Sequence, residues 1–206
     1  MSRKRTLGLL VCGGQSRRMG TDKALVDLAG SRFLDRAMRS LESVSYEVLL
    51  ATGAEPRYAE LGRECVLDEV QDAGPLSGLV AGLRAARDRG AASLAISACD
   101  TPRASSLVFE ALAQKLGTSS ADAVLLRTEQ GIEPLIAIYN VSCFQPALEA
   151  LTEGRRRMTS FHESVDIIHV DEAELPVEAP ATNVNTPFEL RAEREFFGED
   201  VKEREA

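Results

Sequence analysis

The sequence predicts an α/β fold with a mostly parallel central sheet and helices on both faces. Short apolar runs alternate along the chain with segments of helical periodicity. The first run leads into a glycine-rich loop, the place where open α/β sheets bind ligands. The 206 residues suffice for one sizeable core and contain no linker-like stretch. We therefore expect one domain over 1–206, with 1–5 and 198–206 as flexible tails.

The individual elements follow from these patterns. Apolar runs predict strands at Leu7–Cys12, Glu47–Thr52, Cys65–Leu67, Ser93–Ala98, Ala123–Arg127 and Leu135–Tyr139. Helical periodicity predicts helices over Phe33–Leu41, Pro75–Arg87, Ser106–Leu116, Val141–Leu151 and Pro187–Phe196. Such alternation favours parallel strands joined by crossover helices. The carboxyl ends of the strands should then meet at one edge of the sheet, and a site is expected there.

The loop after the first predicted strand is typical of a triphosphate-binding loop. Gly13 and Gly14 lack side chains, so backbone N–H groups can approach phosphate oxygens, while Arg18 and Lys23 supply positive charge. The residues beside Lys23 do not fit a Walker P-loop, and the glycine spacing does not fit a dinucleotide-binding loop. The alternative is a strand-to-helix turn with two surface cations nearby.

Two aspartates follow predicted strands. Asp100 comes after the apolar run Leu94–Cys99, where a carboxylate can bind magnesium beside phosphates. A cap or turn role before Pro102 is the alternative for Asp100. Asp68 precedes Gly74–Gly78, which opens a helix whose free N–H groups could receive a base or a phosphate. Ordinary loop chemistry explains that second segment equally well.

Charge and cysteine content exclude several function classes. With 32 acidic and 24 basic residues the net charge is -8, which argues against a general nucleic-acid or anionic-membrane binder. Neither a membrane-length apolar run nor a signal-peptide pattern is present, so we expect a cytoplasmic protein. The four cysteines are widely spaced and form no C-x-x-C pair. They predict buried thiols rather than a zinc site or disulfides.

The C-terminal third contains two further candidate groups. Arg155 to Arg157 form the densest cationic cluster of the chain and could bind an anionic substrate, or simply end a solvated helix. Asn183 and Asn185 alternate in an extended segment, so both amides could point at a substrate or a metal. Asn185 or Thr186 could also cap the helix that begins at Pro187.

In their order along the chain, these motifs resemble the molybdenum cofactor guanylyltransferases (MobA type) of the nucleotidyltransferase family. The resemblance spans nearly the whole chain and rests on Cys12–Leu25, Asp68, Gly74–Gly78, Cys99–Pro102, Glu133–Tyr139, Gly154–Arg157 and Asn183–Pro187. Family members usually carry Leu-Ala-Gly-Gly where this chain has Val11 and Cys12 before its two glycines. Ala51 replaces a polar residue often found at the end of the second strand, so one nucleotide contact is in question.

The resemblance implies a Rossmann-like three-layer sandwich that transfers GMP from Mg-GTP to the terminal phosphate of molybdopterin, releasing pyrophosphate. It implies catalytic roles for Lys23, Arg18 and Asp100, with magnesium on Asp100. Nucleotide binding is implied at Val11, Cys12, Gly13, Lys23, Asp68 and Asp100, and pterin binding at Arg156, Asn183 and Asn185. Molybdenum insertion proteins and acceptor molybdoenzymes are the implied macromolecular partners.

Two other functions remain open on the sequence. One is a related nucleotidyltransferase that uses CTP or a sugar or polyol phosphate acceptor. The other is a nucleotide-binding regulatory module without turnover, against which Lys23, Arg18 and Asp100 together argue. The cytidylyl relatives usually place alanine where Gly13 stands, and the absent side chain would leave room for a purine. We therefore expect a preference for GTP over CTP.

Overall fold

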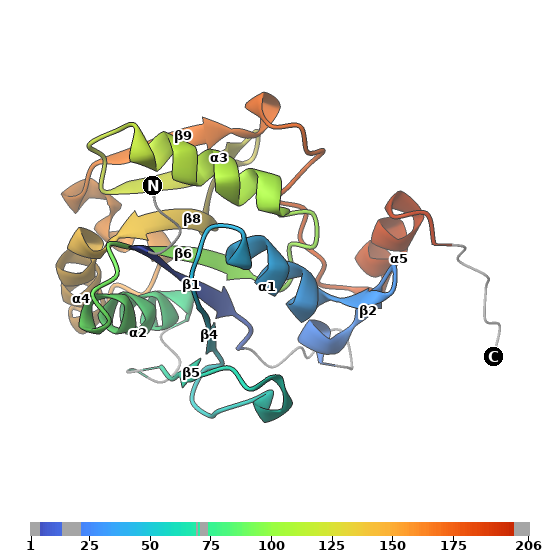
Figure 1. The fold of residues 1–206 in the computed structure, drawn as a ribbon, viewed down its shortest axis with the longest axis horizontal. Coiled ribbons are helices and arrows are strands. Elements are labelled where there is room, and N and C mark those ends of the chain that lie inside the picture. Colours follow the sequence, from blue (N-terminus) through green and yellow to red (C-terminus); the bar gives the residue numbers. More distant parts are fainter. Residues whose placement is uncertain (1–4, 14–21, 69, 71–73, 200–206) are drawn as a thin grey trace.

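The protein is built around a seven-stranded sheet (Figure 1). The computed structural model describes residues 5–13, 22–68, 70 and 74–199. The strand order is β5-β4-β1-β6-β8-β7-β9, and a separate hairpin pairs β2 with β3. The strands are β1 (Thr6–Val11), β2 (Asp27–Leu28), β3 (Ser31–Arg32), β4 (Val48–Ala51), β5 (Cys65–Val66), β6 (Ser93–Ala98), β7 (Ala123–Thr128), β8 (Gly131–Asn140) and β9 (Ile167–Asp171).

Helices cover both faces of the sheet, which confirms the predicted three-layer α/β fold. On one face lie α1 (Phe33–Glu42) and α3 (Ser106–Gly117), and on the other α2 (Pro75–Asp88) and α4 (Phe144–Thr152). The last helix, α5 (Pro187–Phe196), lies to the right in Figure 1, beyond the carboxyl end of β1. The 3₁₀ helices are η2 (Lys23–Leu25), η3 (Ala59–Leu61), η4 (Val141–Cys143), η5 (Met158–Ser164) and η6 (Glu172–Glu174).

The central strands are apolar on both faces, and this explains why they read as continuous apolar runs. Leu9 and Leu10 of β1 are both fully buried, but their side chains lie in opposite core layers because successive strand residues alternate in direction. Leu9 shares its layer with Leu79 of α2, and Leu10 shares its layer with Leu34 of α1. Burial on both sides is the usual situation of strands in parallel sheets.

One strand runs against the others. β8 is antiparallel to β6 and to β7, whereas all other neighbouring strands of the sheet are parallel. The mostly parallel sheet predicted from the sequence is thereby confirmed. The patterns did not predict β9 or the β2-β3 hairpin. β9 is only half-buried and includes His169 and Asp171, so it lacks the continuous apolar run of the other strands.

The strand order creates a topological switch beside β1. The chain proceeds from β1 to β4 and β5 on one side, and then returns to β6 on the other side of β1. The connections that leave β1 and β6 at their carboxyl ends therefore diverge. Crevices at such switch points are where open α/β sheets bind their ligands.

Several other expectations can be compared with the structure. The four cysteines are free thiols, with Cys12 and Cys143 buried and the other two partly buried. Most of the predicted tails lie outside the described residues. In the described part of these tails, the Arg5 carbonyl accepts a hydrogen bond from the Ala92 backbone N–H, and Glu199 forms an ion pair with Arg194. In the parts of the chain that the structure describes, no helix is long and apolar enough to cross a membrane.

Candidate active site

A cavity opens at the switch point between β1 and β6. Its volume is about 280 Å³, and its walls come from the ends of both strands, from η2 and from the start of α2. The lining residues are Val11, Cys12, Gly13, Asp22, Lys23, Ala24, Pro75, Ala98, Cys99, Asp100 and Leu135. Five of the six residues predicted to bind the nucleotide therefore meet in one cavity, as the sequence led us to expect.

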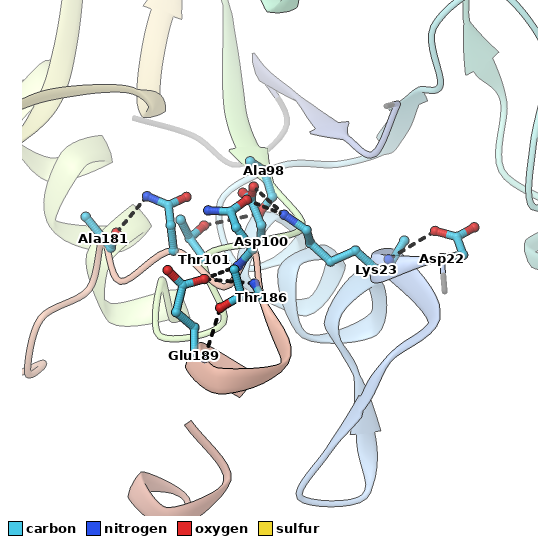
Figure 2. A network of polar contacts seen from close by, with 11 residues as sticks. Asp22, Lys23, Ala98, Asp100, Thr101, Ala181, Thr186 and Glu189 are labelled. Atoms are coloured by element: carbon cyan, nitrogen blue, oxygen red, sulfur yellow. Dashed lines mark hydrogen bonds and ion pairs between the residues drawn. The ribbon is translucent and has the colours of Figure 1, made fainter. Parts of the chain in front are cut away.

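Three polar side chains from distant parts of the chain meet in one contact at this cavity (Figure 2). The Lys23 ammonium donates to Asp100 Oδ2 at 3.2 Å and to Asn185 Oδ1 at 2.6 Å. The Lys23 and Asp100 side chains are only 13% and 27% exposed, so solvent screens their attraction incompletely. The Lys23 ammonium thus lies between two oxygen atoms. Oxygen atoms are the ligands that hard divalent cations prefer.

The backbone around Lys23 is held in place by contacts of Asp22 with Arg57 and Tyr58, which the sequence patterns did not predict. Asp22 caps η2, since its carboxylate accepts a hydrogen bond from the backbone N–H of Ala24 at 3.2 Å. The Tyr58 hydroxyl donates to both Asp22 oxygens at 3.1 and 3.0 Å, and Arg57 donates to Oδ2. Tyr58 adopts a left-handed backbone conformation with φ of 60°, which is uncommon for a bulky residue. This network is specified by tertiary contacts between segments about 35 residues apart.

The Asn185 segment is tied to both Asp100 and α5. The Val184 backbone N–H donates to the Asp100 carbonyl at 2.9 Å. Thr186 caps α5 in a reciprocal capping box, in which Glu189 Oε2 accepts from the backbone N–H groups of Asn185 and Thr186 at 2.6 and 2.9 Å. Figure 2 shows Thr186 and Glu189 at the start of the helix, directly beside Asp100. The predicted capping role of Thr186 is confirmed.

The backbone at the end of β1 is fixed to β4. The N–H groups of Cys12 and Gly13 both donate to the Ala51 carbonyl at 3.0 Å, so the Gly13 N–H already has a partner. The rest of the glycine-rich loop, where we expect backbone N–H groups to approach a phosphate, lies outside the described residues. Ala51 itself is buried in the core, and the Thr52 hydroxyl beside it donates to the Glu55 carbonyl at 2.7 Å. Neither side chain replaces the polar group that relatives often carry there.

Close packing requires a glycine at position 13. A Cβ at this position would lie 2.8 Å from both the Gly53 nitrogen and the Thr52 carbonyl carbon. Such contacts fall well inside van der Waals distance and involve backbone atoms that cannot rotate away. The missing side chain thus allows β1 to approach the loop after β4, and the interpretation of Gly13 as room for a purine stays a prediction.

Two carboxylates flank the cavity in partly buried surroundings. Burial raises the pKa of Asp68, while a hydrogen bond from Ser77 at the start of α2 acts in the opposite direction. Burial also raises the pKa of Glu133, and the nearby negative charge of Asp100 adds to that shift. Asp68 does not line the cavity itself, but its backbone N–H donates to Gly53 at 2.9 Å, which places it on the same edge. Both groups stand where a cationic or hydrogen-bonding ligand would stabilise their charge.

The two cavity thiols are poor nucleophiles. Burial raises the pKa of Cys12, and raises that of Cys99 to about 12. The thiolate is the reactive form, and little of it exists near neutral pH at such values. Covalent chemistry through these cysteines is therefore disfavoured.

The two asparagines predicted to bind a second substrate have different hydrogen-bond partners. Asn185 lies in the Lys23 contact, whereas the exposed Asn183 amide donates to the Ala181 carbonyl at 3.2 Å. Their side chains thus have different partners, although both were expected to point the same way. Arg18 lies outside the described residues, and its predicted role stays untested.

Arg156 is not among the residues that line this cavity. It is exposed and follows α4, on a segment that continues into η5. Phe161 of η5 packs on Tyr139 with ring centroids 5.9 Å apart. Tyr139 pairs with the amino end of β6, roughly 20 Å along that strand from Asp100. Figure 1 accordingly shows α4 at the left end of the molecule and α5 at the right. The pterin role of Arg156 stays a prediction.

The site residues fit a magnesium ion better than a transition metal. Asp100 and Asn185 offer one carboxylate and one amide oxygen, and magnesium commonly takes one or two protein oxygens while the rest of its ligands are waters and phosphates. Among the described residues there is no group of three or more His, Cys, Asp or Glu side chains arranged to hold a metal. A site of this kind depends on the substrate to complete it.

Comparisons with known proteins agree with this geometry. The sequence family described as the MobA-like NTP transferase domain matches residues 8–167. The chain is 32% identical over 189 residues to a protein of Pelotomaculum thermopropionicum named probable molybdenum cofactor guanylyltransferase, with 89% of each chain covered. It is 34% identical over 180 residues to the molybdenum cofactor guanylyltransferase of Burkholderia ambifaria, covering 80% of this chain and 86% of that protein.

A solved structure shares the fold. Molybdopterin-guanine dinucleotide biosynthesis protein A from Archaeoglobus fulgidus superposes with a TM-score of 0.75 at 22% identity, covering 93% of this chain and 98% of that one. A CMP-2-keto-3-deoxy-manno-octonic acid synthetase complexed with CTP superposes with a TM-score of 0.69 at 14% identity. At these identities the likeness shows a common architecture and leaves the substrate to be argued from the site.

Proposed function

The chain belongs to the MobA-like NTP transferase family, and on that premise we propose that it transfers GMP from GTP to the terminal phosphate of molybdopterin. The observation that carries the proposal is the meeting of Lys23, Asp100 and Asn185 at the end of β1 and β6. The sequence relatives named as molybdenum cofactor guanylyltransferases support the choice of substrates. They also favour this reaction over the cytidylyl and sugar-phosphate alternatives.

The reaction requires alignment and charge neutralisation more than proton transfer. An oxygen of the molybdopterin phosphate attacks the α-phosphorus of GTP, the bond between that phosphorus and the bridging oxygen breaks, and pyrophosphate leaves with the electron pair. The attacking phosphate is already ionised because its second pKa is about 6. No general base is therefore needed, and positioned cations supply most of the rate enhancement.

Lys23 is the group that we assign to the developing charge. Its ammonium donates to Asp100 and to Asn185 within the described part of the chain. A triphosphate with its magnesium ion would compete for all three side chains, and the flexible lysine stem lets the ammonium move to a phosphate oxygen. Arg18 would add a second cation from the same loop. Both residues then neutralise the α-phosphate and the departing pyrophosphate.

Asp100 and Asn185 are the residues that we propose to hold magnesium. The bound ion would neutralise phosphate charge and orient the triphosphate. Asp68, which follows β5, would contact the nucleotide, and Val11, Cys12 and Gly13 would form the wall beside it. Asn183 and Arg156 are our candidates for the pterin. Molybdenum insertion proteins and acceptor molybdoenzymes in the cytoplasm are the proposed partners.

The test is nucleotide-dependent release of pyrophosphate in the presence of molybdenum-loaded molybdopterin. The parent protein is assayed with GTP, CTP and ATP at equal concentrations, each with and without the acceptor. We expect release only with the acceptor present and fastest with GTP. Faster release with CTP would assign the chain to the cytidylyl relatives. Pyrophosphate release at the same rate with and without the acceptor would indicate a nucleotide pyrophosphohydrolase instead.

A further inference from the structure

A buried ion pair joins the loop after β6 to α5. Arg103 Nε and Nη2 donate to Glu193 Oε2 and Oε1 at 2.8 and 2.7 Å, and the two side chains are only 13% and 2% exposed. The Arg103 guanidinium also lies over the Phe196 ring, 3.5 Å from its centroid. This bidentate contact therefore fixes the direction as well as the distance between two segments that are remote in the sequence.

Each of the two joined segments carries one oxygen donor of the site. Arg103 follows Asp100 by three residues, and Glu193 lies on the helix that begins directly after the Asn185 segment. The same two segments are attached a second time by the hydrogen bond from Val184 to the Asp100 carbonyl. Two attachments at different points prevent one segment from sliding or pivoting on the other.

We propose that Arg103 and Glu193 are positioning residues that set the separation of the Asp100 carboxylate and the Asn185 amide oxygen for a divalent cation. The inference rests on the proposed function only in taking these two oxygens as cation ligands. Stability alone is a weak reason for such a pair, because apolar residues of similar size commonly stabilise a core as well or better. An arginine fork, in contrast, holds one geometry, and supports of this kind around metal ligands strongly affect metal affinity.

Two variants separate positioning from folding. R103K keeps the charge but cannot form the bidentate contact. The double variant R103M/E193L replaces the ion pair with an apolar pair, so no unpaired buried charge remains. The matched control is R89K, since Arg89 pairs with Glu64 at 2.6 Å at the opposite end of α2. Unfolding midpoints identify any variant that is not folded.

The readout is binding of Mn²⁺ in the presence of GTP and without acceptor, followed by the electron paramagnetic resonance signal of free Mn²⁺. We expect R103K and R103M/E193L to bind Mn²⁺ about 10-fold more weakly than the parent, with GTP affinity in the absence of metal unchanged. R89K should match the parent. Parental Mn²⁺ affinity in a folded R103M/E193L protein would overturn the proposal. If R103K does not fold, the Mn²⁺ affinity of R103M/E193L alone tests the positioning role.

These results also separate this inference from the proposed function. A parent protein that makes no product from GTP, combined with weaker Mn²⁺ binding in the variants, would contradict the transfer reaction and leave the positioning role standing. Product formation by the parent, combined with parental Mn²⁺ binding in both variants, would reject the positioning role alone.

Discussion

At the residue scale, the site depends on the Lys23 ammonium, which contacts the Asp100 carboxylate and the Asn185 amide oxygen before any substrate arrives. Lys23 lies between Asp100 and Asn185, so both oxygens already face a cation at the place where a metal ion could bind. The sequence predicted Lys23 and Asp100 because each follows an apolar strand-like run. It did not predict that Asn185 joins them, because a contact between residues 162 positions apart leaves no local pattern.

Removal of the ammonium should abolish most turnover without unfolding the protein. Lys23→Ala loses the cation that we assign to the α-phosphate and the leaving group, and loss of one such group typically lowers kcat about 10²- to 10³-fold. The circular dichroism spectrum should not change. Lys115→Ala, at an exposed position of α3, serves as the control and should keep parental kcat. A folded Lys23→Ala protein with near-parental kcat would remove this lysine from the mechanism.

The buried charge of the ionised Asp68 carboxylate should lower the free energy of unfolding at neutral pH. Burial raises its pKa above the ordinary value of 3.8. The stabilising contribution of the neutral form is therefore complete below pH 3.8, and it is lost as the pH rises through the folded-state pKa. Asp68→Asn cannot ionise, so its Tm should exceed that of the parent at pH 7, while the two values converge near pH 3.5. Its KM for GTP should rise.

The control for this pH dependence is Asp88→Asn at the exposed end of α2. Its Tm should differ from the parental value by the same small amount at both pH values. The same behaviour in Asp68→Asn would mean that burial of Asp68 costs nothing, and our explanation of its raised pKa would then be wrong.

At the element scale, the sequence patterns predicted the elements with strong periodicity and missed those that depend on tertiary contacts. β6 and α5 begin and end at the predicted residues. The β2-β3 hairpin has two-residue strands, which are too short for any alternation to be seen. The antiparallel direction of β8 follows from the tight turn after Thr128, where only two residues separate β7 from β8. A crossover helix cannot fit in that length.

Adding a single methyl group at Gly13 tests whether the close packing of β1 on the loop after β4 requires a glycine. Gly13→Ala places a Cβ 2.8 Å from backbone atoms of Thr52 and Gly53, so the loop must shift, at a cost of roughly 1–3 kcal/mol in the free energy of unfolding. Turnover with GTP and with CTP should fall together, because the methyl group meets the backbone of Thr52 and Gly53 and displaces that loop for either nucleotide. The measurements are Tm and the ratio of kcat/KM for the two nucleotides.

Gly78→Ala in α2 is the matched control. Its Cβ would lie 3.4 Å from that of Ala51, which is an ordinary contact, and alanine is favoured over glycine inside a helix by up to about 1 kcal/mol. We expect its Tm to equal or exceed the parental value. If Gly13→Ala instead kept parental Tm and selectively lost turnover with GTP, the glycine would serve the purine after all.

At the scale of the whole molecule, the sheet order brings together residues from nearly the full length of the chain. β1, β6 and the segment before α5 each supply one side of the site, although the matched family region ends at residue 167. With a net charge of -8 the protein as a whole repels a triphosphate. Binding must therefore depend on the local cations of this edge, and Lys23 lines the cavity there.

The most direct test of the proposed reaction follows the phosphates themselves. The parent protein is given molybdopterin and GTP labelled with ³²P at either the α- or the γ-phosphate, and the products are separated. We predict that the α-label appears in a molybdopterin guanine dinucleotide and the γ-label in pyrophosphate. Transfer of the γ-label to the acceptor, or its release as inorganic phosphate while the α-label stays in GDP, would contradict guanylyl transfer.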